Sequence, residues 1–429
     1  MPLQLRKVKL YLKKRIGLFR KVFYTFGLIF FVCCSFGCWG EDVKSEPTSP
    51  ANLSHVLSLV DSVKVDGKNI TFVYIYSNYP DYKPAIASGE GVSCVDDVGR
   101  MLEVLEHEVL NWGNDSLKFV AKGMTEFLLR MCTEDGLWYN FIYKNGNINK
   151  THQNSIASFG WWAVRGLRGL ASAYNIFSHV DEDDTLLENI RAKIFVSQSQ
   201  WRKRLVSYGK YKNTDIGRIP AWLINDASDV TSELILALTK LYRAGFTEYY
   251  DDIRKFSEAI VLTQFRDDCH PLNGMYFCWK NLWHCWGNNQ AYALTESFRI
   301  IGDASYLSSV KVWADNFVRF VVNEDYPNEI KLFSDSTYVI KDYPDIAYGI
   351  NSIYRGLKSL YEISNNEEYQ SLAERVFGWY KGNNVVGVKM YDEETGRCYD
   401  GIDESGVNLN SGAESTIECL LSIYKRGYY

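Results

Sequence analysis

The chain carries no excess of positive charge: 52 Asp and Glu outnumber 47 Lys and Arg, for a net charge of −5. Eight of the positive side chains also lie within the first 21 residues, so the remainder is more acidic still. A face that binds nucleic acid needs concentrated Lys and Arg to neutralise phosphates. The sequence therefore argues against a nucleic-acid partner.

The cysteines lack the spacing of a disulfide framework. Seven of them follow Cys38, an odd number at irregular intervals, so most are expected to be small buried apolar side chains. The segment 269–285 holds three cysteines and two histidines, but it has no Cys-x-x-Cys pair and matches no standard zinc pattern. We therefore predict no metal and no other cofactor.

The apolar run Val22–Phe36 is short for a membrane span. It follows a basic segment and ends before Gly37 and Cys38, so residues 1–37 are predicted to be a signal peptide of the lipoprotein type. Cys38 would be the lipidated first residue, although Ser35 stands where a bulky aliphatic residue is typical. A single uncleaved membrane anchor is the alternative.

Residues 38–52 are predicted to be a tether, because the stretch is rich in Ser, Pro and charge. Trp39–Asp42, directly after the cysteine, resembles the acidic export tag of surface lipoproteins. We expect an outer-membrane lipoprotein that faces the periplasm or the cell surface and meets the membrane through its lipid anchor.

Six segments of one design recur along the rest of the chain, beginning near residues 95, 160, 227, 288, 345 and 413. Each is about four to five turns long and apolar nearly all round, as in Gly160–Ala171, which predicts a helix buried nearly all round. Glycines inside such helices cost stability, so we expect them to serve close helix packing.

Amphipathic segments lie between these buried helices. In the first of them, Leu117, Met124 and Leu128 share one stripe, while Lys118 and Glu126 lie opposite, as in an outer helix with a wet face. The five outer segments are 115–132, 185–203, 248–264, 305–322 and 367–382.

Six inner helices call for six outer ones, and Leu53–Val63 is predicted to be the missing helix, packed against residues 413–426. The sequence thus predicts an all-α fold, an (α/α)6 toroid of six helical hairpins over residues 53–429. The loops that lead from outer to inner helices are long, and long loops on one face of a scaffold usually carry function. The working face should be the rim where the inner helices begin, where helix dipoles favour carboxylates.

The predicted rim mixes aromatic planes with amides and carboxylates, as a sugar site requires. Aromatic faces pack on pyranose rings, and polar groups satisfy the hydroxyls. The candidate sugar-binding residues are Trp138, His152, Gln153, Trp161, Trp162, Trp222, Asp229, Trp286, Asn289, Gln290, Tyr348 and Asn410.

Glycosidic hydrolysis needs two carboxyl groups, one protonated and one ionised. Asp97 and Asp345 are the predicted pair, with Glu90 and Glu414 as alternates.

Helix capping is the competing interpretation of each of these carboxylates. Ser411–Glu414 fits a capping box, and Asp229 could cap its own helix. Asp96 and Asp97 are adjacent, so if one of them caps the helix, the other still has no structural role.

The hairpin order resembles the six-hairpin glycosidase superfamily of carbohydrate-active enzymes over roughly residues 53–429. Glu90–Val98 and Asn410–Thr416 look like signatures of that superfamily. Its members include hydrolases, lyases and epimerases whose catalytic positions differ, so the resemblance implies no particular catalytic residue.

Three functions are compatible with the predicted fold and rim. The first is a glycoside hydrolase that acts on an oligo- or polysaccharide. The second is a lyase or epimerase on uronic-acid sugars, with His152 or a rim Tyr as base and Arg218 against the carboxylate. The third is a non-catalytic glycan-binding lipoprotein. In each case the partner is a carbohydrate, and we expect a monomer.

Overall fold

The computed structural model describes residues 49–180, 184–215 and 217–427, which belong to one compact unit, Pro47–Tyr429. The predicted signal peptide, Cys38 and the tether as far as residue 48 lie outside the described residues. Among the helices that are described, none is both long enough and apolar enough to cross a bilayer.

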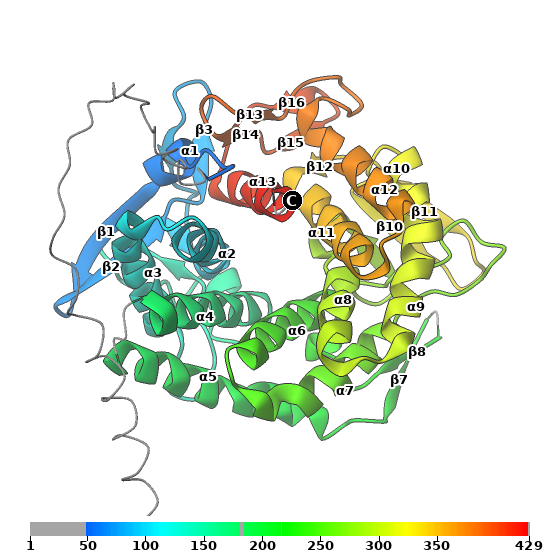
Figure 1. The fold of residues 1–429 in the computed structure, drawn as a ribbon, viewed down its shortest axis with the longest axis horizontal. Helices are drawn as coiled ribbons and strands as arrows, with labels where there is room; N and C mark the ends of the chain where they lie inside the picture. Colours follow the sequence, from blue (N-terminus) through cyan, green and yellow to red (C-terminus); the bar gives the residue numbers. More distant parts are fainter. Residues whose placement is uncertain (1–48, 181–183, 216, 428–429) are drawn as a thin grey trace, which may run out of the picture. The chain divides into compact units, whose positions relative to one another are not determined.

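Six helices form a closed inner ring (Figure 1). Each packs beside the next in chain order, and the last packs beside the first. They begin within two residues of the predicted starts, because their apolar surface extends nearly all round and is buried nearly all round. The inner helices are α2 (Val95–Glu106), α4 (Trp161–Val180), α6 (Ser228–Arg243), α8 (Gln290–Ile301), α11 (Ala347–Ser364) and α13 (Ala413–Arg426).

Amphipathic helices cover the outside of the ring at the five predicted positions. Their buried stripes face the inner helices, and their charged stripes face solvent. The outer helices are α3 (Lys118–Met131), α5 (Asp184–Leu205), α7 (Tyr250–Val261), α9 (Ala304–Val312), which continues through a π-helical turn into α10 (Arg319–Asn323), and α12 (Glu367–Phe377).

The prediction of a sixth outer helix over Leu53–Val63 is wrong. The chain makes little more than one helical turn there and then enters a β-hairpin, whose strands join through Asp66 and Gly67. Both turn residues have positive φ, 51° and 80°, as a two-residue type I′ turn requires. The hairpin packs on α3 and the short helix on α13, so the ring closes directly between α13 and α2. These elements are α1 (Ser54–Ser58), β1 (Val60–Val65) and β2 (Lys68–Val73).

The long loops carry short antiparallel strands, so the predicted all-α class describes the ring itself. The loop strands pair as β3 (Tyr76–Asn78) with β4 (Lys83–Ala85), β5 (Ser93–Cys94) with β6 (Phe141–Ile142), β7 (Tyr211–Thr214) with β8 (Gly217–Pro220), β10 (Glu329–Leu332) with β9 (Leu282–His284) and β11 (Tyr338–Lys341), β15 (Gly401–Asp403) with β12 (Asp345–Ile346) and β16 (Gly406–Asn408), and β13 (Tyr391–Asp392) with β14 (Arg397–Cys398).

Glycines bring α2 and α4 into backbone contact, as the sequence predicts. A Cβ atom on Gly169 would lie 2.6 Å from the Cα atom of Gly99. A Cβ atom on Gly99 would in turn lie 2.6 Å from the carbonyl oxygen of Arg165. Neither neighbour can move without separating the two helices.

Gly169→Ala is therefore expected to destabilise the protein. Overpacking against backbone costs about 1–3 kcal/mol, which outweighs the gain of about 1 kcal/mol that alanine brings to a helix interior. The measurement is the chemical-denaturation midpoint by circular dichroism. A midpoint above that of the wild type would show that the two helices separate freely at this contact.

Candidate functional site

A cavity of about 420 Å³ opens on the rim where the inner helices begin, the face predicted from the loop lengths. The first turns of α2, α4, α11 and α13 line it, together with the loops before α4, α8 and α11. The lining residues are Asp96, Arg100, Asn140, Phe141, Asn154, Trp161, Trp162, Trp286, Ile346, Tyr348 and Glu414.

A hollow of similar size, about 450 Å³, lies on the outer surface between β2, α3 and α5. None of its lining residues is aromatic, and its two carboxylates are both engaged: Asp66 pairs with Arg130, and Glu126 pairs with Lys68. The rim cavity is therefore the better candidate for chemistry on a ligand.

Three tryptophans form the aromatic walls of the rim cavity. The Trp162 indole N–H donates a 2.6 Å hydrogen bond to the backbone carbonyl of Trp138, which fixes its orientation. Trp286 stacks on His284 with ring centroids 4.1 Å apart and an interplanar angle of 19°. Trp161 stands at the first position of α4. Such fixed aromatic planes suit the C–H faces of sugar rings.

Arg100 organises the polar side of the cavity. Its Nη1 lies 3.1 Å from Asp97 Oδ1, its Nη2 lies 2.8 Å from Glu414 Oε1, and its Nε lies 2.9 Å from Glu418 Oε1. The guanidinium also sits 4.7 Å from the centroid of the Tyr348 ring. Arg100 thus holds three carboxylates from two helices in fixed positions.

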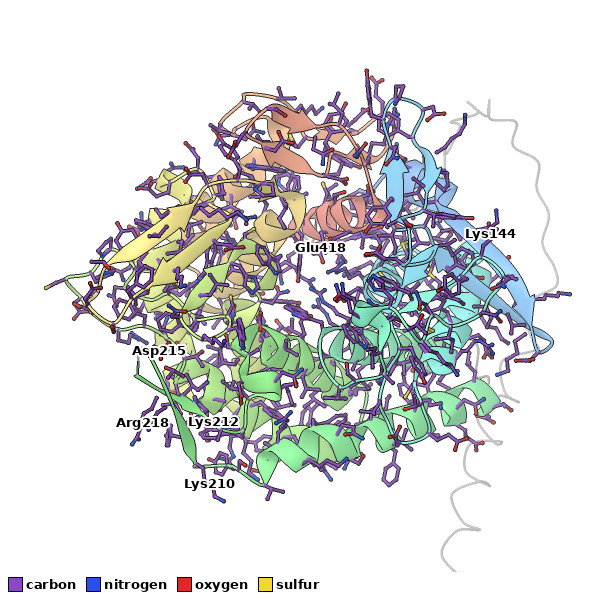
Figure 2. All side chains as sticks on the ribbon, turned by 180° about the vertical axis from the view of Figure 1, so that it is seen from behind. Lys144, Lys210, Lys212, Asp215, Arg218 and Glu418 are labelled. Carbon is purple, nitrogen blue, oxygen red and sulfur yellow. The ribbon has the colours of Figure 1, made fainter. Side chains whose placement is uncertain are left out.

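A buried ion network continues below the cavity along the axis of the ring. Arg165 Nη2 lies 3.1 Å from Glu233 Oε1, and Arg168 bridges Glu233 and Glu103 with contacts of 2.7 Å to each. Arg165 also reaches Glu418 at 3.6 Å, and Figure 2 shows Glu418 on α13, near the centre of the ring. A buried network with its charges paired makes a rigid floor for the cavity.

Burial raises the affinity for protons of two carboxyl groups around Arg100. Burial raises the pKa of Asp97 to about 7, against the attraction of Arg100. Burial also raises the pKa of Glu414; Arg100 opposes that shift, and the charge of Asp96 adds to it. Because the Glu414 side chain is 47% exposed, solvent moderates its shift. Asp96 is 27% exposed, and its Oδ1 lies 3.7 Å from Arg165 Nε without a hydrogen bond.

Neither Asp97 nor Glu414 caps a helix. The cap of α2 is the Cys94 sulfur, which accepts the backbone N–H of Asp97. Glu414 contacts Arg100, while the backbone N–H of Ser411 donates to a carbonyl of β3, so the capping-box interpretation is wrong. Both carboxylates stay within the Arg100 cluster.

Asp345 and Glu90, two further catalytic candidates, do not line the cavity. Asp345 lies in β12, which pairs with β15, and is only 3% exposed. Burial, reinforced by two aspartates in the preceding loop, raises the pKa of Asp345 to about 8. Glu90 accepts a hydrogen bond from the Tyr76 hydroxyl at 2.9 Å. The predicted partnership of Asp345 with Asp97 in one cleft is therefore not what the structure shows.

Four of the predicted sugar-binding residues lie in structural contacts instead. Trp138 and Trp222 belong to the core, and their indole N–H groups donate to α5 and α7. Asn289 Nδ2 donates a 2.6 Å hydrogen bond to Glu233 Oε1 in the buried ion network. Asp229 lies 3.0 Å from His284 Nε2 and is 3% exposed. A tryptophan in a rim loop can equally anchor that loop to the core, which the sequence pattern does not distinguish.

Four more candidates also lie outside the cavity lining. His152 Nδ1 accepts a hydrogen bond from the backbone N–H of Asn154. Gln153 is exposed. Gln290 is fully buried and donates to a neighbouring carbonyl and a serine hydroxyl. Asn410 accepts a backbone N–H from the β3–β4 turn. Of the predicted sugar-binding set, the structure brings Trp161, Trp162, Trp286 and Tyr348 to the cavity.

Arg100, Asn140 and Phe141 also line the cavity, although none of them was predicted from the sequence. A usable signal existed for the charged centre, because Arg165 and Arg168 lie inside a mostly apolar helix. A buried Arg requires carboxylate partners, so its presence there indicates a charged centre.

Comparisons with known proteins bear on the fold. No protein-family model matches the chain, and no curated protein is similar to it. A solved cellobiose 2-epimerase from Bacillus thermoamylovorans B4167 is 12% identical, with 88% of this chain and 96% of that chain covered and a TM-score of 0.60. A sugar epimerase from a ruminal bacterium is 15% identical, with 83% and 92% covered and a TM-score of 0.61. A D-mannose isomerase is 12% identical, with 87% and 93% covered and a TM-score of 0.59.

The chain has the (α/α)6-toroid fold. The predicted fold class is thereby confirmed, and the resemblance noted in the sequence holds at the level of the fold. TM-scores of 0.59 to 0.61 establish a shared fold. At identities of 12% to 15%, the reaction must be argued from the residues of this chain.

Proposed function

We propose that this toroid is a carbohydrate-active enzyme, specifically a glycoside hydrolase that acts in the rim cavity. The observation that carries the proposal is the presence of two carboxyl groups, Asp96 and Glu414, in one cavity with three tryptophans. Hydrolysis of a glycosidic bond needs a proton donor and a second, ionised carboxylate, and aromatic walls hold the sugar rings.

Glu414 is the proposed proton donor, because its pKa is raised while its side chain still reaches the cavity. Asp96 is the proposed base or nucleophile, which activates water or attacks the anomeric carbon. Arg100 positions Glu414, and Asp97 positions Arg100 through its own ion pair. In the sugar complex, a separation of about 6.5–9.5 Å between the two carboxyl groups would produce inversion and about 5–5.5 Å retention.

The charge of the cavity favours a neutral sugar over a uronic acid. Asp96 and Glu414 contribute two carboxyl groups and, among the lining residues, the single cation, Arg100, already contacts three carboxyl groups. Arg218, the predicted partner of a uronate, stacks 4.7 Å from the Tyr211 ring on the β7–β8 hairpin and lies at the outer edge of the molecule (Figure 2). A uronate in the cavity would lack an unpaired cation to neutralise it.

A panel of neutral and uronate-containing glycans tests the proposal. We expect the purified protein to release new reducing ends from at least one neutral member. Release of reducing ends from none of them would contradict the proposed function. Release from uronate-containing glycans alone, without the ultraviolet absorbance of an unsaturated product, would keep the hydrolase but contradict the substrate class; with that absorbance it would contradict hydrolysis as well.

An epimerase or isomerase is the second candidate, because solved proteins described as sugar epimerases and a mannose isomerase share this fold over most of the chain. Such a reaction needs a base beside an acidic C–H bond. None of the residues that line the cavity is a histidine, so a carboxylate or Tyr348 would have to serve. His152, the base considered from sequence, lies outside the lining.

We also propose that the protein is an exported lipoprotein and a monomer. Cys38→Ala is expected to abolish incorporation of radiolabelled palmitate and to move the protein from the membrane to the soluble fraction, because one lipidated cysteine is the whole anchor. Cys33→Ala, a cysteine inside the predicted signal peptide, is the matched control and should leave labelling unchanged. Labelling that persists in Cys38→Ala would contradict the assignment.

A further inference from the structure

Behind the aromatic wall of the cavity, the fold gathers three metal-ligating side chains that the sequence keeps apart. Asp229 lies in the first turn of α6, Cys278 precedes β9, and His284 ends β9. Their donor atoms all lie within 4.8 Å of one another, and all three residues are buried. The Asp229 carboxylate and the His284 imidazole already approach to 3.0 Å.

We propose that Asp229, Cys278 and His284 bind one zinc ion. Carboxylate, thiolate and imidazole are the ligand types that zinc prefers. With a deprotonated Cys278 and an ionised Asp229, the complex of a divalent ion with the neutral imidazole carries no net charge. That neutrality matters because an unbalanced charge is costly to bury, and all three side chains are buried.

Four buried polar atoms without hydrogen-bond partners belong to His284 and to three residues that follow it closely in the chain. They are His284 Nδ1, Asn288 Nδ2, Asn289 Oδ1 and Gln290 Oε1. A concentration of orphan polar atoms in one seven-residue stretch, 284–290, calls for an explanation, and a hydrated cation would supply partners. The Gln290 side chain is also in reach of Cys278, with its Nε2 3.5 Å from the sulfur.

Gly287 keeps the space beside these donors free. A Cβ atom at this position would lie 2.3 Å from His284 Cε1 and 2.9 Å from Asp229 Oδ2. Because the backbone runs directly against two of the three ligands, only glycine leaves their positions undisturbed. The ion would also set the orientation of Trp286, which stacks on the His284 ring and lines the cavity.

The segment 269–285 shows no zinc spacing in the sequence because the site takes only two ligands from it. Asp229 comes from the start of a different inner helix, some 50 residues earlier. The proposal does not depend on the reaction in the cavity, because its tests measure bound metal.

Metal content of the full chain, purified without chelator, is the first test. We expect about one zinc per chain by inductively coupled plasma mass spectrometry, and less than a tenth of that in Cys278→Ser and in His284→Asn. Cys285→Ser is the matched control, because Cys285 is equally buried next to His284 but lies outside the cluster. It should keep its zinc.

Cobalt substitution of the wild-type protein is the second test and does not rely on variants that could misfold. Replacement of zinc by Co²⁺ should give a near-ultraviolet thiolate-to-cobalt band that Cys278→Ser lacks and Cys285→Ser keeps. Wild-type protein without zinc and without that band after Co²⁺ addition would overturn the proposal. Metal of equal amount in wild type and Cys278→Ser would also overturn it.

Discussion

Glu414→Gln and Asp96→Asn are each expected to lower kcat/KM on a hydrolysed glycan by about 10²–10⁴-fold, the usual contribution of a general acid or base. Gln and Asn keep the shape and the hydrogen-bonding capacity of the side chains but cannot exchange the proton. For Glu414→Gln we also expect loss of the alkaline fall in rate, because that fall in the wild type reports deprotonation of Glu414. The measurement is the pH profile of kcat/KM.

Asp345→Asn is the matched control. Asp345 is about as buried as Glu103 and Glu233, the carboxylates of the ion network, but it does not line the cavity. Its pKa is raised to about 8, so the side chain is largely protonated at pH 7 and Asn is a close replacement. Activity within about threefold of the wild type is expected. A loss in Asp345→Asn as deep as in Glu414→Gln would contradict the assignment of the site.

Arg168→Leu is expected to cause the largest loss of stability, about 3–5 kcal/mol, because it leaves two buried carboxylates without their shared partner. Arg168 contacts Glu103 and Glu233 at 2.7 Å each, and all three side chains are at most 3% exposed. The measurement is the free energy of unfolding in urea at pH 7. Arg426→Leu removes a half-exposed pair with Glu374 and is the control, with an expected loss of at most about 1 kcal/mol.

The same network predicts the pH dependence of stability. Burial alone would raise the pKa of Glu103, but the charges of Arg168, Lys240 and Arg355 outweigh burial and hold it well below its ordinary range. A carboxyl group whose pKa is depressed by folding stabilises the native state above its unfolded pKa and loses that contribution as the pH falls. Stability should therefore drop below about pH 4.5, and less steeply in Arg168→Leu. An equal acid slope in both proteins would contradict this account of the network.

The helices were predictable because helical periodicity in a long segment is a strong local signal. All six inner helices and five outer segments occur where the sequence places them. The failure over Leu53–Val63 has a local cause as well. Val60, Val63 and Val65 are β-branched, and the Asp66-Gly67 pair that follows is a typical hairpin turn. The helix predicted there rested on the number of helices needed to close the ring and not on this local signal.

The location of the site on the rim was predictable from the sequence, but only some of its residues were. The sequence was sufficient to predict Glu414, Tyr348 and the three tryptophans of the cavity. They lie in the first turns of inner helices or just before them. Asp96 and Asp97 differ by 100° around α2, so one lines the cavity and the other pairs behind it with Arg100. That difference depends on how α2 is rotated against its neighbours, which long-range packing decides.

The central claim is that the rim cavity hydrolyses a glycosidic bond, and proton NMR of the reaction in D₂O tests it most directly. We predict a new anomeric proton signal from each cleaved bond, complete retention of all carbon-bound hydrogens, and loss of the reaction in Glu414→Gln. Deuterium incorporation at C2 of an uncleaved sugar, or a vinyl proton in the product, would identify epimerisation or elimination and contradict the claim.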